Sequence, residues 1–250
     1  MPRCRIIPSL LIEDGRLVKT VGFAKPRYIG DPVNSLRIFS EFGADEVLIQ
    51  DRGSGRRGID FETVAAMASE AFVPVAYMGG VKEVDDAKRL VHSGVEKIGI
   101  TTGFIDNPTL ITEVANVLGQ SSAMVGIDVL DYGLGSIVPI DRRTMRPTGT
   151  TLAAMIRDAC DRGAGEIAVN CVTRDGMRGG VAEEAVREAV TASSVPVLYG
   201  GGVGTFDDIR RTVRLGVSGV VVGSLFVLVG ARRGVLITYP TICQRQEIVQ

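Results

Sequence analysis

The sequence predicts a closed (β/α)8 barrel built from two similar halves, and two observations support this fold class. Short apolar segments typical of buried strands alternate with helical patterns along the whole chain. In addition, the stretch VPVAYMGGV at 73–81 returns as VPVLYGGGV at 195–203. The match runs without a gap, since Pro74 pairs with Pro196 and Phe104 with Phe226, each 122 positions apart. A repeat of this length indicates a fold assembled from two equivalent units. A doubly wound sheet is the rival arrangement, but it gives no reason for such a repeat.

The predicted strands are short β-branched runs that end in small or acidic residues. Because they are apolar on both faces, they suit a parallel sheet covered by helices. We expect eight of them, near 5–11, 46–51, 73–77, 96–101, 123–128, 166–171, 195–199 and 219–223.

Helical patterns lie between these strands, near 31–42, 60–71, 83–93, 107–118, 150–162, 181–192 and 205–215. Asp31-Pro32 and Asn107-Pro108 each place a capping residue before a proline, which suits the first turn of a helix. Glycines fall where helices should end, at Gly43, Gly94, Gly119, Gly163 and Gly216. No eighth helix can be assigned after Phe226, so we treat 227–250 as an atypical C-terminal segment of a single barrel domain, 1–250.

Composition narrows the function classes. The net charge of −1 gives no field for a polyanion, so we expect no nucleic-acid partner. There is no apolar run long enough for a membrane span and no export signal, and the four cysteines show neither metal-ligand spacing nor the density of a disulfide scaffold. We therefore expect a cytoplasmic protein with no metal and no cofactor. His92 is the only histidine, so a Ser-His or Cys-His nucleophile system is not expected, and Cys171 is interpreted as a small apolar residue.

The repeated segment itself suggests a binding function. In a (β/α)8 barrel the functional groups lie at the C-terminal ends of the strands, where both glycine turns fall. The following strand in each half ends in a small hydroxyl residue, at Thr101-Thr102 and at Ser224. Backbone N–H groups at such a turn can bind an anion. Two related sites would hold a ligand with a phosphate at each end, whereas the plainer alternative is a pair of ordinary tight turns.

Several motifs resemble those of a known family. They are RIIPSLLIEDGRLVKTVGF at 5–23, GDP at 30–32, GADE at 43–46, GAGEI at 163–167, RDG at 174–176 and GGVG at 201–204. Together they resemble the cyclase subunit of imidazole glycerol phosphate synthase. The resemblance implies a (β/α)8 barrel that takes ammonia from a glutaminase subunit. It also implies use of that ammonia to cleave and cyclise a bisphosphorylated ribonucleotide, which yields imidazole glycerol phosphate and an aminoimidazole carboxamide ribonucleotide.

The resemblance also implies the binding residues. One phosphate would lie at Gly79, Gly80, Thr101 and Thr102, and the other at Gly176, Gly201, Gly202, Gly223 and Ser224. Lys19 on the first βα loop would assist charge neutralisation. Asp51 and Asp175 would be polar groups at the rim of the site.

The expected reacting centre departs from the family pattern. The family uses two aspartates, of which the strand-five member is present as Asp128, while Leu11 occupies the strand-one position. Leucine can neither donate nor accept a proton, and the nearby Glu13 is the candidate to replace the missing acid. Met78, Thr101 and Gly200 also differ from the family's glycine, asparagine and serine.

At the opposite end of the barrel, the resemblance implies a ring of charges that gates the passage of ammonia from a partner bound at this face. The matching residues are Arg5, Glu46, Lys97 and Glu166, two cationic and two anionic. Such charges can be buried only if they pair with one another. The alternative is that they are solvated strand ends.

Two features point to one branch of the family. Leu11 and the ending LFVLVGARRGVLITYP resemble proteins associated with acetamidino modification of surface-polysaccharide sugars. In that branch the barrel and a glutaminase supply ammonia to a separate sugar amidotransferase. The leading hypothesis is therefore an ammonia-channelling barrel of this branch. An authentic cyclase of histidine biosynthesis, a lyase working with Asp128 and a substitute acid, and a non-catalytic activator of the glutaminase are the alternatives.

Overall fold

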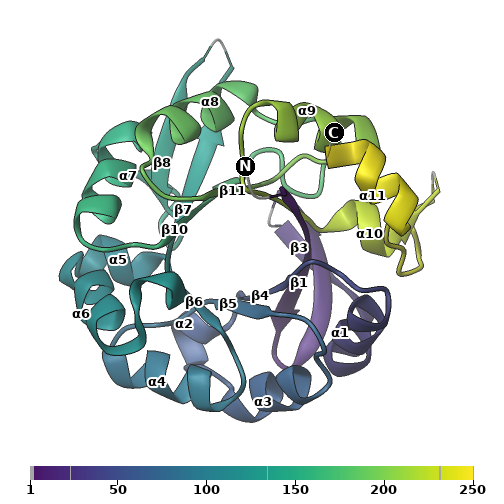
Figure 1. Cartoon of the computed structure of the whole chain (residues 1–250), viewed down its shortest axis with the longest axis horizontal. Coiled ribbons are helices and arrows are strands. Elements are labelled where there is room, and N and C mark those ends of the chain that lie inside the picture. The colour runs from purple at the N-terminus through teal and green to yellow at the C-terminus, as the bar shows by residue number, and fades with distance from the viewer. Residues whose placement is uncertain (1–2, 23, 134, 231, 250) are drawn as a thin grey trace.

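The computed structural model describes residues 3–22, 24–133, 135–230 and 232–249, and its centre is a closed barrel (Figure 1). Every barrel strand pairs in parallel with the next, and the last pairs with the first, which closes the sheet. The predicted (β/α)8 fold is thus confirmed, and an open doubly wound sheet is excluded. The strands are β1 (Arg5–Glu13), β4 (Val47–Asp51), β5 (Val75–Met78), β6 (Lys97–Ile100), β7 (Ala123–Asp131), β10 (Glu166–Cys171), β11 (Val197–Gly200) and β12 (Gly219–Val222).

The helices surround the barrel as an outer layer. All seven predicted helices are present: α1 (Pro32–Glu41), α3 (Phe61–Ser69), α4 (Val84–His92), α6 (Thr109–Leu118), α7 (Leu152–Asp161), α8 (Glu183–Ala192) and α9 (Phe206–Arg214). Asp31 caps α1 as expected, because its side chain accepts a hydrogen bond from Asn34 N. Asn107 accepts one from Thr109 N, and α6 begins at Thr109, two residues after the start of the predicted range. None of the described helices has the length and apolar content needed to cross a lipid bilayer.

The internal repeat is visible in the backbone angles. Thr101 has φ −111° and ψ −91°, and its counterpart Gly223 has φ −102° and ψ −86°. The caps of α4 and α9, Glu83 and Thr205, have φ −145° and −141° with the same ψ of 164°. Both helices begin with a capping box in which an aspartate is the third helical residue. The two halves therefore share local geometry as well as sequence.

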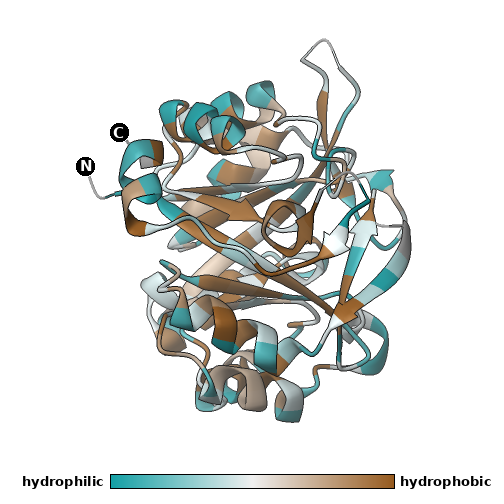
Figure 2. Ribbon diagram, turned by 90° about the vertical axis from the view of Figure 1, so that its right-hand side faces the viewer, coloured by the Kyte–Doolittle hydropathy of each residue, from teal (hydrophilic) through white to brown (hydrophobic). Residues whose placement is uncertain are grey.

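Apolar side chains fill two layers. The larger core lies between the strands and the helices, and the strands are correspondingly the most hydrophobic part of Figure 2. A second, smaller cluster fills the inside of the barrel, because alternate strand residues point inward. Its members are Ile7, Leu48, Ala76, Met78, Met124, Ala168, Leu198 and Val221.

Several elements were not predicted. A hairpin of β2 (Arg16–Val21) and β3 (Ala24–Gly30) follows β1, and β8 (Ile137–Asp141) and β9 (Arg146–Pro147) follow β7. Short helices α2 (Ser54–Arg57), α5 (Thr102–Asp106), α10 (Ser224–Val227) and the 3-10 turn η1 (Gln120–Ser122) lie in the loops. The segment 227–250 contains the hairpin β13 (Leu228–Val229) and β14 (Gly234–Val235), followed by α11 (Ile242–Val249). This last helix packs against α9 and takes the place of the missing eighth helix.

Candidate functional site

A cavity of 720 Å³ opens at the C-terminal ends of the barrel strands. Inward-pointing strand residues form its wall, and loop residues form its rim. From the strands and strand ends come Leu11, Gln50, Met78, Thr101, Asp128 and Asn170, and from the loops Arg52, Ser54, Arg56, Arg142 and Arg143. These four arginines each pair with carboxylates: Arg52 and Arg56 with Glu13, Arg142 with Asp128, and Arg143 with Asp106 and Asp141.

The first predicted phosphate cradle lines this cavity, with Gly79, Gly80, Thr101 and Thr102 all in its wall. The two glycines have φ 143° and 67°, a backbone region that favours glycine. A Cβ at Gly80 would lie 2.7 Å from the Cβ of Ser54. The glycine is therefore required by packing against the loop of α2 as well as by the turn.

The second predicted cradle is arranged differently. Gly176, Gly201, Gly202, Gly223 and Ser224 lie outside the set of cavity-lining residues, although their neighbours Gly200 and Val221 belong to it. The β2–β3 hairpin covers this cradle. Lys19 Nζ lies 2.5 Å from the position that a Cβ on Gly223 would take, and Thr20 O lies 2.1 Å from the corresponding position at Gly176.

Lys19, the predicted cation of the second cradle, lies beside Gly223. Its ammonium donates a hydrogen bond to Ser9 O at 3.1 Å. Burial lowers the pKa of Lys19, and the negative charge of Asp175 partly opposes that shift.

Asp128 projects into the cavity from β7. Asn170 Nδ2 donates to its Oδ1 at 3.0 Å, and Arg142 Nη1 lies 3.7 Å from its Oδ2. Asp175 belongs to the same charge cluster, and burial raises the pKa of its carboxyl group against the influence of Lys19 and Arg142. Asp128 is among the cavity-lining residues, whereas Asp175 is not.

Leu11 forms part of the cavity wall and is only 4% exposed. Glu13, the candidate replacement for the missing acid, points elsewhere. Its carboxylate pairs with Arg52 at 3.2 Å and Arg56 at 3.5 Å, and it is not among the lining residues. The described geometry therefore gives no support to Glu13 as a second acid in the cavity.

Asp51 anchors the loop that follows β4. Its side chain is fully buried, and its Oδ1 accepts from the backbone N of Gly53 and Ser54 at 2.9 and 3.1 Å. Arg57 and the Tyr77 hydroxyl also donate to the carboxylate. Burial raises the pKa of Asp51, and the Arg57 charge opposes this. Sequence reasoning placed this residue at the rim, and it did not reveal these four donors.

The four charged residues at the N-terminal mouth form a closed ring. Lys97 Nζ lies 3.0 Å from Glu46 and 2.9 Å from Glu166, and the Arg5 guanidinium pairs with the same two carboxylates. Glu46 and Glu166 are 2% and 4% exposed. We name this set the charge ring. Its members are thus paired with one another, unlike solvated strand ends.

Met78 lies in the barrel between the charge ring and the cavity. It belongs both to the inner apolar cluster and to the cavity wall. Its Cγ lies 2.2 Å from where a Cβ on Gly99 would be, and its Cε lies 2.1 Å from that position at Gly126. The two glycines leave room for the methionine, which lines the cavity together with Leu48, Ala168 and Val221 of the inner cluster.

Groups dismissed at the sequence level are placed as follows. His92 is exposed at the end of α4, and its ring contacts Lys88 O. Cys171 is buried. Within the described part of the chain, no group of three or more His, Cys, Asp or Glu residues could hold a metal ion.

A closed barrel with an arginine-rimmed cavity at the C-terminal ends of its strands defines an enzyme-like (β/α)8 protein. Comparison with known proteins gives the family. Residues 5–229 match the family described as "Histidine biosynthesis protein". The chain belongs to this family, and within it to the relatives of the imidazole glycerol phosphate synthase subunit HisF.

Three relatives illustrate this similarity. A Leptospira borgpetersenii protein named "Putative imidazole glycerol phosphate synthase subunit HisF" is 38% identical over 245 residues, covering 96% of each chain. The Pseudomonas aeruginosa subunit hisF2, named in the same way, is 37% identical over 248 residues, covering 97% of this chain and 98% of its own. The Gluconacetobacter diazotrophicus "Imidazole glycerol phosphate synthase subunit HisF" is 32% identical over 228 residues, covering 90% and 88%.

Sequence reasoning missed the arginines of the rim. Arg52 and Arg56 lie in the run DRGSGRRG, and Arg142 and Arg143 lie in DRRT. Both runs directly follow strands, and positive charge at such positions was an available signal. The second run was missed because the β8–β9 extension that brings it over the cavity was not predicted.

Proposed function

We propose that this chain is the barrel subunit of a complex in which a glutaminase releases ammonia at the N-terminal mouth. The ammonia passes through the barrel to the C-terminal cavity. The observation that carries the proposal is the charge ring. In this ring each cation contacts both carboxylates. If one side chain of the ring moved aside to open a path, the remaining charges would still be paired, so no lone charge would be left buried.

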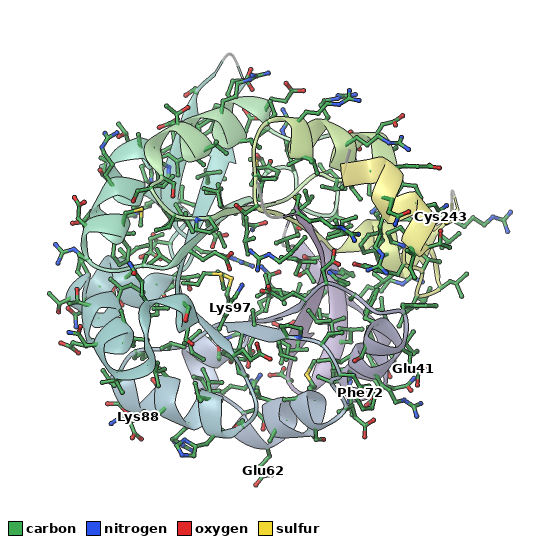
Figure 3. All side chains as sticks on the ribbon, viewed as in Figure 1. Glu41, Glu62, Phe72, Lys88, Lys97 and Cys243 are labelled. Carbon is green, nitrogen blue, oxygen red and sulfur yellow. The ribbon has the colours of Figure 1, made fainter. Side chains whose placement is uncertain are left out.

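The partner is proposed to dock at the same mouth. Two large aromatic side chains are exposed on loops of that face, Phe72 at 82% and Phe42 at 47%. Figure 3 looks onto this mouth and shows Phe72 at the periphery and Lys97 toward the centre. Exposed aromatic residues are typical anchors of protein interfaces. A partner anchored at this rim would face the charge ring and would release ammonia at the entrance.

We further propose that the ammonia serves acetamidino modification of surface-polysaccharide sugars by a separate amidotransferase. Leu11 supports this branch, because it supplies an aliphatic group where the cyclase reaction would need a carboxyl group. Glu13 is occupied by two arginines and does not replace it. The cavity would then deliver ammonia, and its first cradle and arginines would bind a phosphorylated effector or substrate.

The second candidate is the cyclase reaction of histidine biosynthesis. Asp128 favours it, since Asn170 and Arg142 hold this carboxylate in the cavity. Asp175 lies in the same charge cluster, and these two carboxyl groups would share the acid and base roles. The third candidate, a non-catalytic activator of the glutaminase, needs the docking face but not the passage.

Turnover assays separate these candidates. The bisphosphorylated ribonucleotide is incubated with the chain and ammonium salts, and formation of imidazole glycerol phosphate is followed. The leading proposal predicts no turnover, and robust turnover would establish the cyclase instead. Leu11→Asp tests whether the rest of the reacting centre is intact, since it should confer activity only in that case.

The passage is tested in the complex with the glutaminase. Lys97→Met should leave glutamine hydrolysis intact while glutamine-dependent amidation of the acceptor falls. Lys88→Met, on an exposed helix position, is the matched control. Unchanged amidation in the Lys97 variant would support the activator and remove the passage from the proposal.

A further inference from the structure

The C-terminal segment contacts the two strand starts that carry half of the charge ring. The Tyr239 hydroxyl donates to Ile6 O at 2.8 Å and accepts from Asp45 N at 3.3 Å. Ile6 directly follows Arg5, and Asp45 directly precedes Glu46. A residue more than 190 positions away in the chain thus bridges the backbones beside Arg5 and Glu46.

This bridge fills a gap left by the stagger of the barrel. The ladder between β1 and β4 begins only at Ser9 and Leu48. Arg5 N bonds to Ser218 O on the β12 side, so the backbone groups of Ile6 face β4, because strand residues alternate in direction. Because Ile6 precedes the first paired residues of β1 and β4, its N–H and C=O groups need hydrogen-bond partners other than the backbone of β4. The Asp45 carboxylate accepts from Ile6 N at 2.9 Å, and Tyr239 donates to Ile6 O.

Arg245 on α11 fixes the other end of this contact. Its Nη1 donates to Gly43 O at 2.6 Å and lies 3.3 Å from Asp45 Oδ1. The arginine is 8% exposed, and its guanidinium lies 5.3 Å from the centre of the Tyr239 ring. Asp45 is therefore held between Ile6 and Arg245, and the chain after Phe226 supplies two of the three polar side chains.

The Tyr239 ring is itself fixed by aromatic packing. Its centroid lies 5.3 Å from that of Phe226 and 6.3 Å from that of Phe39, both edge-on. Phe226 and Phe39 are almost fully buried. The hydroxyl therefore has a defined position relative to the core, and it can transmit that position to Ile6 and Asp45.

We infer that Tyr239, Asp45 and Arg245 are positioning residues for the charge ring. We call them the seam cluster. They fix the backbone next to Arg5 and Glu46 and thereby keep these two side chains in register with Lys97 and Glu166. The relevance of this register to ammonia rests on the proposed function, whereas the positioning itself does not.

Chemical labelling of lysines tests the inference. The sequence has only five lysines, at 19, 25, 82, 88 and 97. Each can be followed by peptide mass spectrometry after brief treatment of the full chain with an amine-acylating reagent. Lys97 reports on the charge ring, Lys19 on the opposite end of the barrel, and the exposed Lys88 on reagent activity.

The variant is Tyr239→Phe, which keeps the aromatic side chain and removes both hydrogen bonds of the hydroxyl group. We expect Lys97 to be labelled on the order of tenfold faster than in the unsubstituted chain, while Lys19 and Lys88 keep their rates. Tyr132→Phe, at a tyrosine that is 64% exposed, is the matched control and should change none of the rates. Asp45→Asn, which weakens the contact with Arg245, gives a second reading if Tyr239→Phe does not fold.

Two outcomes would overturn the inference. An unchanged Lys97 rate would mean that the seam cluster does not hold the charge ring. A parallel rise at Lys97 and Lys19 would mean that the hydroxyl stabilises the whole barrel without a specific effect on the mouth. If the proposed passage of ammonia were disproved, the labelling rates of Lys97 and Lys19 would still test the positioning, because they do not depend on ammonia.

Discussion

Removal of Lys97 from the charge ring should measurably destabilise the barrel. Lys97 Nζ contacts two carboxylates at 3.0 and 2.9 Å, whose side chains are 3% and 5% exposed. Breaking a fully buried pair costs about 3 to 5 kcal/mol. Lys97 is 20% exposed, and Arg5 still pairs with both carboxylates, so the cost is reduced. For Lys97→Met we expect a loss of about 2 kcal/mol in the free energy of unfolding.

Urea and thermal unfolding measure this loss. For a chain of this size, 2 kcal/mol corresponds to a fall in Tm of about 4 to 8 °C. Adding Glu166→Gln restores neutrality in the ring, since Arg5 then faces one carboxylate. The double variant should therefore cost less than the sum of the two single variants, by about 1 kcal/mol or more. Lys88→Met is the control and should stay within about 0.5 kcal/mol of the unsubstituted chain.

A cost below about 0.5 kcal/mol for Lys97→Met, with additive single variants, would refute this reasoning. The four residues would then behave as solvated strand ends. The ion pairs would then contribute nothing measurable to the free energy of unfolding, and the charge ring would no longer support the proposed passage.

Three further results are expected. Burial raises the pKa of the Cys4 thiol to about 12, so a thiol reagent at pH 8 should modify the exposed Cys243 within minutes and Cys4 only after unfolding. Gly126→Ala should cost about 1 to 3 kcal/mol in urea unfolding, because its Cβ would lie 2.1 Å from Met78 Cε, and adding Met78→Ala should recover part of that loss. Asp51→Asn should cost about 1 to 2 kcal/mol by the same measurement, since the amide cannot keep the ion pair and every hydrogen bond of the buried carboxylate. Rapid labelling of Cys4, additive Gly126 and Met78 effects, or a neutral Asp51 substitution would each contradict the corresponding geometry.

The barrel could be predicted because its determinants are local and repeated. Apolar strands, capped helices and a gapless repeat all point to the same fold, and a closed sheet is the arrangement that satisfies them together. The tail could not be predicted in this way. Tyr239 and Arg245 find their partners near Ile6 and Asp45, and no periodicity within 227–250 reports a contact so distant in sequence.

The site was predictable in part for the same reason. Asp128, Leu11 and the first cradle lie on strand ends, whose direction follows from the fold, and the structure brings them to one cavity. Asp51 lies there too, but its burial depends on the loop conformation around Arg57. The covered second cradle depends on the β2–β3 hairpin, whose residues the sequence analysis assigned to a loop. The conformation of the loops therefore determines which of the predicted site residues line the cavity.

Both ends of the described chain lie on the same side of the barrel, opposite the β2–β3 hairpin (Figure 2). Affinity tags, fluorophores or surface tethers are usually fused at chain ends, and here either choice would crowd the mouth that holds Lys97. A label placed instead at the exposed Tyr132, which follows the C-terminal end of β7, would leave that entrance unobstructed.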